Sequence, residues 1–95
     1  MIHLLATVSI EDLPNFLGVF STQGAEMRRK HGSRASQVFR VPGENNRVLI
    51  LFTWESREAF EGFRSDPAVK ETMKASGTVG APEFTFLEKV GDFPG

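Results

Sequence analysis

The stretch Arg47-Val-Leu-Ile-Leu-Phe-Thr-Trp-Glu55 decides the fold, because residues 48–54 are all apolar or β-branched and carry no charge. Branched and aromatic side chains favour a β-strand. Side chains of a strand point to alternate faces, so both faces of this one receive apolar residues: Val48, Ile50, Phe52 and Trp54 on one, Leu49, Leu51 and Thr53 on the other. Both faces of this strand therefore need to be buried against other parts of the chain or against another chain.

The composition is that of an ordinary soluble globular domain, which we expect to span 1–95 as a single unit. The formal net charge of -1 gives no electrostatic reason to expect nucleic acid or an anionic membrane as a partner. The absence of cysteine excludes disulfides and thiolate chemistry. No signal peptide and no apolar run of about 18 residues is visible, so we expect a cytoplasmic protein.

Hydrophobic periodicity predicts six elements. In chain order they are a strand at 2–10, one helix from about 13 to 30, a strand at 33–41, the central strand at 47–55, a helix bent at 65–67, and a strand at 83–90 after a connector at 78–82. Asp12, Ser56 and Asp66 are expected to cap helix N-termini, and Gly32 is expected to end the first helix.

This β-α-β-β-α-β order predicts a ferredoxin-like α+β fold, with a four-stranded antiparallel sheet and two helices on one face. The second apolar face of the central strand then stays open. Packing two sheets face to face would bury it, which predicts a C2 homodimer with a shared barrel-like interior. The alternative is a monomer with an exposed apolar face.

Segments spread over residues 1–90 resemble one group of known proteins: Met1-Ile-His-Leu-Leu5, Glu26-Met-Arg-Arg-Lys-His-Gly-Ser33, Leu51-Phe-Thr-Trp-Glu55, Asp66-Pro-Ala-Val-Lys-Glu-Thr-Met73 and Gly80-Ala-Pro-Glu-Phe-Thr-Phe-Leu-Glu88. The group is the dimeric α+β barrel superfamily, and the resemblance is closest to small bacterial proteins described as cyclase-like or antibiotic-biosynthesis-monooxygenase-like. It implies a homodimer with facing sheets and a small-molecule pocket between sheet and helices. It also implies cofactor-free monooxygenase or cyclase-like chemistry on an apolar aromatic compound.

The sequence departs from active superfamily members at several places. It has no tyrosine, and no histidine follows His31, whereas haem-degrading relatives use a histidine on the second helix. Haem degradation is therefore not expected. Close relatives often carry a basic residue and a histidine in the middle of the first strand, where Thr7 and Val8 stand here. A non-catalytic ligand-binding or structural homodimer is thus the alternative function.

Two polar residues are candidates for catalysis. His3 is a candidate general base, because a histidine pKa is readily tuned near neutrality, and Gln37 is a candidate for orienting a ligand carbonyl. Cofactor-free oxygenation needs little else, since the substrate itself activates oxygen in an apolar pocket. For both residues the alternative is a hydrogen-bonded role at the dimer interface. The expected ligand pocket, with ordinary core packing as the alternative, contains Trp54, Phe39, Phe52, Phe63, Met73 and Phe86.

Basic residues gather between 28 and 47, where Arg28, His31 and Arg34 form a candidate anion site. The alternative is a solvated helix end whose charges favour the helix dipole. Two distant histidines, no cysteine and no clustered carboxylates predict no metal site, and no cofactor is expected.

Overall fold

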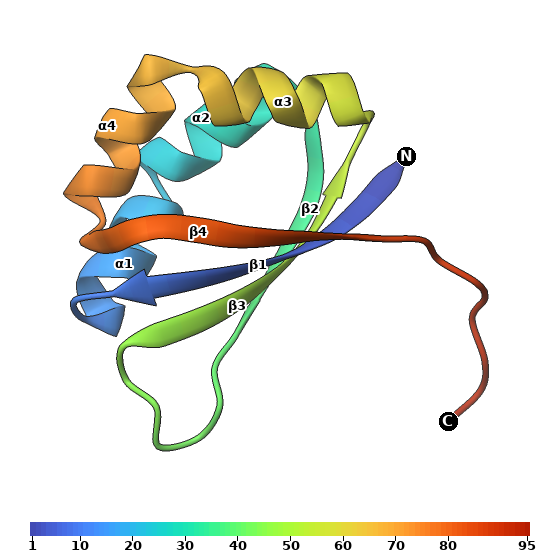
Figure 1. Cartoon of the computed structure of the whole chain (residues 1–95), viewed down its shortest axis with the longest axis horizontal. Coiled ribbons are helices and arrows are strands. Elements are labelled where there is room, and N and C mark those ends of the chain that lie inside the picture. Colours follow the sequence, from blue (N-terminus) through green and yellow to red (C-terminus); the bar gives the residue numbers. More distant parts are fainter.

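The computed structural model describes residues 1–95 and has four strands and four helices (Figure 1). The chain order is β1 (Ile2–Ile10), α1 (Leu13–Phe20), α2 (Gln23–His31), β2 (Ser33–Phe39), β3 (Arg47–Trp54), α3 (Arg57–Ser65), α4 (Pro67–Ala75) and β4 (Thr78–Leu87). The strands form one antiparallel sheet in the order β2-β3-β1-β4, and the helices lie on one side of it. The predicted ferredoxin-like α+β fold is confirmed.

The helical layer differs from the expectation of two helices. The first helical segment is broken into α1 and α2 by Ser21 and Thr22. The Thr22 hydroxyl donates to the Gly18 carbonyl at 2.8 Å, and Arg28 Nη1 donates to the Phe20 carbonyl at 2.9 Å. Side chains of this kind compete with the helical ladder for backbone groups, so the apolar spacing continues while the helix does not.

The predicted helix ends are confirmed at four positions. Asp12 accepts from the Asn15 N–H at 2.8 Å, and Ser56 accepts from the Ala59 N–H at 3.1 Å. Asp66 ends α3 and caps α4 by accepting from the Ala68 N–H at 2.9 Å. Gly32 ends α2 with φ 97°, a conformation that favours glycine.

The last strand begins at Thr78, five residues before the predicted start. Ser9 pairs with Val79 and Thr7 pairs with Glu83, so residues 80–82 oppose a single residue of β1. This is a β-bulge, and Gly80 adopts φ +71° within it. Pro82 is tolerated because β4 is an edge strand. The predicted connector is therefore the bulged first half of β4.

The core lies between the sheet and the helices. Side chains of β1 and β3 alternate between the two faces as predicted, and those on the helix side are the buried ones. The core consists of Leu4, Ala6, Val8, Ile10, Phe16, Val48, Ile50, Phe52, Trp54 and Phe60. Trp54 is 0% exposed, which places the indole under the helices.

The opposite face of the sheet has no helix over it. Cross-strand pairing aligns three rows there: Ala35–Thr53–His3–Leu87, Gln37–Leu51–Leu5–Thr85 and Phe39–Leu49–Thr7–Glu83. We refer to these twelve residues as the open face. Phe39 is 52% exposed and Leu87 42% exposed. The single chain thus leaves an apolar sheet surface uncovered, as the central strand predicts.

Candidate functional site

A cleft of about 790 Å³ opens between α3, α4 and the bulged part of β4, at the edge of the sheet. Its volume falls within the range of roughly 300–1,000 Å³ that is usual for small-molecule sites. The apolar part of its lining comes from Phe63, Val69, Met73, Ala81, Pro82 and Phe84. We call this space the α3–α4–β4 cleft. The sequence predicted a pocket between sheet and helices, and this cleft occupies that place.

The bulge shapes one wall of the cleft. Gly80, Ala81 and Pro82 all line it, and none of the three pairs with β1. Sequence reasoning missed these residues, because glycine and proline were interpreted as a connector. A glycine inside an otherwise strand-like pattern was the available signal for a bulge, a feature that is common beside binding sites.

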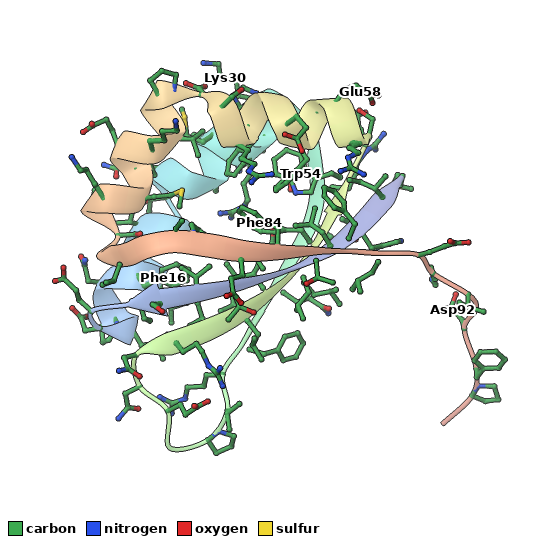
Figure 2. The ribbon with its side chains drawn as sticks, viewed as in Figure 1. Phe16, Lys30, Trp54, Glu58, Phe84 and Asp92 are labelled. Carbon is green, nitrogen blue, oxygen red and sulfur yellow. The ribbon has the colours of Figure 1, made fainter.

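Aromatic rings pack together beside the cleft (Figure 2). Phe63 lines it and lies 4.9 Å from the Trp54 ring, centroid to centroid, while Phe84 lies 5.1 Å from the Phe60 ring. Figure 2 shows Trp54 and Phe84 in the layer between α3 and the sheet. The rings of Phe63 and Phe84 therefore give the inner wall of the cleft an aromatic surface, which suits a flat apolar ligand.

Trp54 Nε1 is a buried donor without a hydrogen-bond partner, the one such side-chain nitrogen or oxygen in the chain. Leaving a buried donor unpaired costs about 1–3 kcal/mol, so it calls for an explanation. The Phe63 ring packs against the indole and also lines the cleft.

Charged side chains form the rim of the cleft. Arg64 lies over the Phe84 ring at 5.1 Å and 3.7 Å from Glu61. Lys70 and Lys74 also line the cleft, and neither takes part in any of the chain's ion pairs. Glu71 completes the charged lining. None of these charged residues is a predicted site residue, because helix periodicity alone does not show which charged face borders a cavity.

The sheet separates the predicted site residues into two groups. His3, Gln37 and Phe39 lie on the open face, where His3 Nδ1 is 3.0 Å from Thr53 Oγ1. On the helix side, Phe63 and Met73 line the cleft. Trp54, Phe52 and Phe86 pack in or against the core behind it. The predicted catalytic pair and the predicted pocket therefore do not meet within one chain.

The three candidate anion ligands do not converge. Arg28 packs over the Phe20 ring at 3.8 Å, and burial together with the neighbouring Arg29 lowers its pKa to about 10. Arg34 pairs with Glu55 at 2.9 Å. His31 bonds Asp66. Each predicted ligand thus has a partner of its own within the fold.

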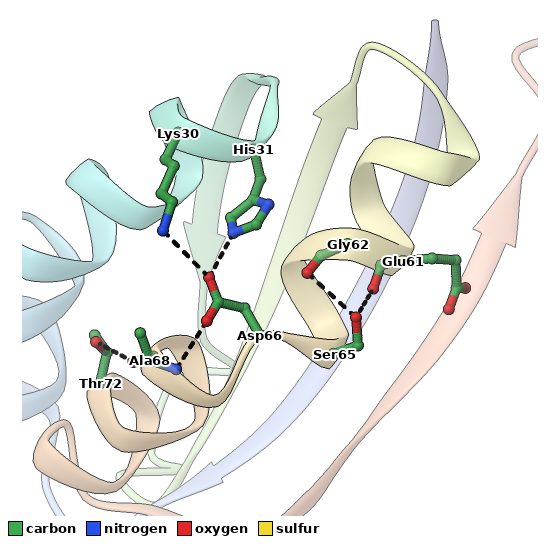
Figure 3. A network of polar contacts seen from close by, with 8 residues as sticks. All are labelled: Lys30, His31, Glu61, Gly62, Ser65, Asp66, Ala68 and Thr72. Carbon is green, nitrogen blue, oxygen red and sulfur yellow. Dashed lines mark hydrogen bonds and ion pairs between the residues drawn. The ribbon is translucent and has the colours of Figure 1, made fainter.

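His31 belongs to a polar network that joins α2 to the junction of α3 and α4 (Figure 3). Its Nε2 lies 2.8 Å from Asp66 Oδ2, and Lys30 Nζ approaches the same oxygen at 3.7 Å. The hydrogen bond from His31 and that from the Ala68 N–H lower the pKa of Asp66. The His31 ring also meets the edge of Phe63 at 6.0 Å, so the network helps to fix a wall of the cleft.

No three His, Cys, Asp or Glu side chains gather where they could hold a metal ion. None of the helices is long and apolar enough to cross a membrane.

Comparison of the sequence with models of protein families shows which family the chain belongs to. Residues 1–75 match the model of the family described as antibiotic biosynthesis monooxygenase. The chain belongs to this family. Proteins of the family are typically homodimers. No curated protein sequence matches the chain at a significant level.

Solved structures of the same fold cover nearly the whole chain. SnoaB, a cofactor-independent oxygenase from Streptomyces nogalater, has a TM-score of 0.76 and 17% identity, covering 99% of this chain and 97% of its own. A protein from Caulobacter crescentus assigned as an antibiotic biosynthesis monooxygenase has a TM-score of 0.73 and 22% identity, with 95% and 90% covered. A MhuD variant with two manganese protoporphyrin IX molecules per active site has a TM-score of 0.67 and 21% identity, with 100% of both chains covered. These similarities establish the fold.

Proposed function

We propose that this family member binds a flat hydroxylated aromatic compound in the α3–α4–β4 cleft and oxygenates it without a cofactor. The observation that carries the proposal is the cleft of about 790 Å³, whose lining includes the aromatic rings of Phe63 and Phe84. Family membership supports oxygenase chemistry, and the cofactor-independent oxygenase SnoaB shares the fold.

The proposed chemistry uses the electrons of the substrate. In anthrone, the CH₂ group lies between two aromatic rings and is conjugated through them with the opposite carbonyl. It loses a proton to water, the resulting carbanion passes electrons to O₂, and the peroxide that forms takes up a proton from water. A C–O bond forms, giving a hydroperoxide that loses water. One oxygen atom enters the product as C=O and the other leaves as H₂O, so CH₂ + O₂ gives C=O + H₂O. The chain's contribution is a cleft that holds and orients the substrate against the rings of Phe63 and Phe84.

Oxygen uptake with anthrone and its ring-hydroxylated derivatives tests the proposal. We expect one O₂ consumed per anthrone and appearance of anthraquinone. Replacing the exposed Ala81 of the cleft wall by tryptophan (Ala81→Trp) should fill the cleft and abolish uptake. Ala75→Trp, at an exposed α4 position outside the cleft, is the matched control and should retain it. No uptake above the uncatalysed rate with any substrate would refute the oxygenase.

The open face is the second place where chemistry could occur, because it carries His3 and Gln37. We propose that neither residue acts on a substrate held in the cleft, since the sheet lies between them. His3→Ala and Gln37→Ala should therefore leave oxygen uptake unchanged. A large loss in either variant, with the fold intact, would move the chemistry to the open face and restore the roles predicted from the sequence.

We further propose that a second copy of the chain covers the open face. The support is the set of apolar rows on that face and the typical homodimeric state of the family. A non-catalytic ligand-binding homodimer is the second candidate function, favoured by the absence of histidine from the cleft lining. Ligand binding in the cleft without oxygen uptake would select it.

A further inference from the structure

We propose that the α3–α4–β4 cleft recognises an acidic group on its aromatic ligand through Lys70 and Lys74. This inference rests on the proposed function only in placing the ligand in the cleft, and it holds for an enzyme and for a binding protein alike. The ligand class is then a flat aromatic compound that bears a carboxylate or a sulfonate-like anion at one edge.

Lys70 and Lys74 both lie on α4 and line the cleft. They stand four residues apart on α4, so both side chains leave the same face of the helix, one turn from each other. Both line the cleft together with Val69 and Met73 from the same helix. Two lysines therefore border the cleft beside the apolar Val69 and Met73, with Glu71 also in the lining.

The charges of these two lysines lack an internal ion-pair partner. Arg64, the third cation of the lining, is already engaged by Glu61 at 3.7 Å and by the face of Phe84 at 5.1 Å. No carboxylate lies within 4.0 Å of the Lys70 or Lys74 nitrogen. Both lysines are solvent-exposed, so an anion that the ligand brings with it would form an exposed ion pair with them, which adds a modest binding energy.

The bulge at 80–82 forms the wall of the cleft opposite α4. Gly80 has no side chain and Ala81 has only a methyl group, so this wall leaves the cleft open. A ring system can therefore lie between the bulge and the aromatic wall formed by Phe63 and Phe84. Its acidic edge would then point along α4 toward the lysines. Glu71 lines the same cleft, and its carboxylate repels an anionic ligand. Replacing Glu71 should therefore change the affinity of the cleft for anions.

Two fluorescent probes that differ by one anionic group test the inference: 1-anilinonaphthalene-8-sulfonate and the uncharged N-phenyl-1-naphthylamine. We expect the sulfonate to bind more tightly to the wild-type protein, and its affinity to fall with added salt, while that of the neutral probe stays constant. Each of Lys70→Gln and Lys74→Gln should weaken sulfonate binding about two- to fivefold, the range of a solvent-accessible ion pair. Neither change should alter binding of the neutral probe.

Two further variants sharpen the result. Glu71→Gln should tighten sulfonate binding, because it removes the opposing charge from the lining. Lys89→Gln removes a lysine from the C-terminal tail outside the cleft, and it should have no effect on either probe. Ala81→Trp should block both probes.

The outcomes separate this inference from the proposed function. Equal affinity for the two probes, or sulfonate binding that survives the double Lys70→Gln and Lys74→Gln change, would overturn the inference while leaving the cleft as a binding site. Binding of both probes that Ala81→Trp does not reduce would overturn the cleft itself, and the proposed function with it. Loss of charge preference together with retained neutral binding in the double variant would support the inference.

Discussion

The two faces of the sheet differ in what covers them, although they are built from alternate residues of the same strands. On β3, Ile50 is 3% exposed beneath the helices, whereas its neighbour Leu51 is only half-buried on the open face. The helix side carries a stack of phenylalanines, a buried indole and a cleft. The open side mixes apolar side chains with polar ones, which are His3, Thr7, Gln37, Thr53, Glu83 and Thr85.

This difference shows how one apolar strand serves two purposes. The helix side is completed within the chain, so its residues determine the stability of the fold and shape the ligand cleft. The open side is not completed within the chain, so its residues determine assembly. In our account ligand chemistry and dimer formation are therefore assigned to opposite faces and should respond to different substitutions.

The largest expected effect is on stability and comes from the helix side. Ile50→Ala should lower the free energy of unfolding by about 2–5 kcal/mol, because it leaves a cavity in a packed core. The adjacent Leu51→Ala is the matched control and should cost about 1 kcal/mol or less in dilute protein. Urea unfolding at several protein concentrations measures both. Equal costs that do not depend on concentration would contradict the distinction between the faces.

An effect on assembly should follow from charging the open face. Leu51→Glu places a carboxylate opposite Leu5 in the middle row, and we expect it to prevent face-to-face packing. Sedimentation at micromolar concentration should show a dimer for the wild type and a monomer for this variant. Arg29→Glu, at an exposed position on α2, is the control and should remain dimeric. A wild-type monomer would contradict the role of the open face.

The smallest effect should be on the acid stability of the helix layer. The pKa of Asp66 is lowered in the folded chain by its hydrogen bond from His31. The stabilisation from this carboxylate is therefore complete above its ordinary pKa of 3.8 and is lost as the pH falls through the lowered value. Asp66→Asn should flatten the decline in melting temperature at acid pH, while Asp92→Asn, in the tail, should not. If the melting temperature of Asp66→Asn declined at acid pH as steeply as that of the wild type, the Asp66 network would not contribute to acid stability.

Much of the fold was predictable because its signals are local. Alternation along residues 2–10 predicted a strand and its buried face, and the apolar run at 48–54 predicted a strand without showing which face the helices cover. Side-chain caps at Asp12, Ser56 and Asp66 predicted the helix starts. The break at Ser21 and Thr22 was missed because it depends on hydroxyl and guanidinium bonds to backbone carbonyls, while the apolar spacing runs through it.

The site was less predictable because it depends on which faces meet. Trp54 and Phe39 have similar character in the sequence, yet strand register places them on opposite sides of the sheet. Lys70 and Lys74 look like an ordinary solvated helix face until the bulge at 80–82 is placed across from them. Phe63 and Met73 were predicted as pocket residues and line the cleft, since both follow from the apolar stripe of their helices.

The most direct test is a titration of the ¹⁵N-labelled protein with 2-naphthol, followed through its amide resonances and through the indole N–H of Trp54, the single tryptophan. Our account predicts that the shifted resonances belong to Phe63, Met73, Gly80 and Ala81, together with that indole. Shifts confined to Leu5, Gln37 and Leu51 would contradict it, because the ligand would then occupy the open face instead of the cleft.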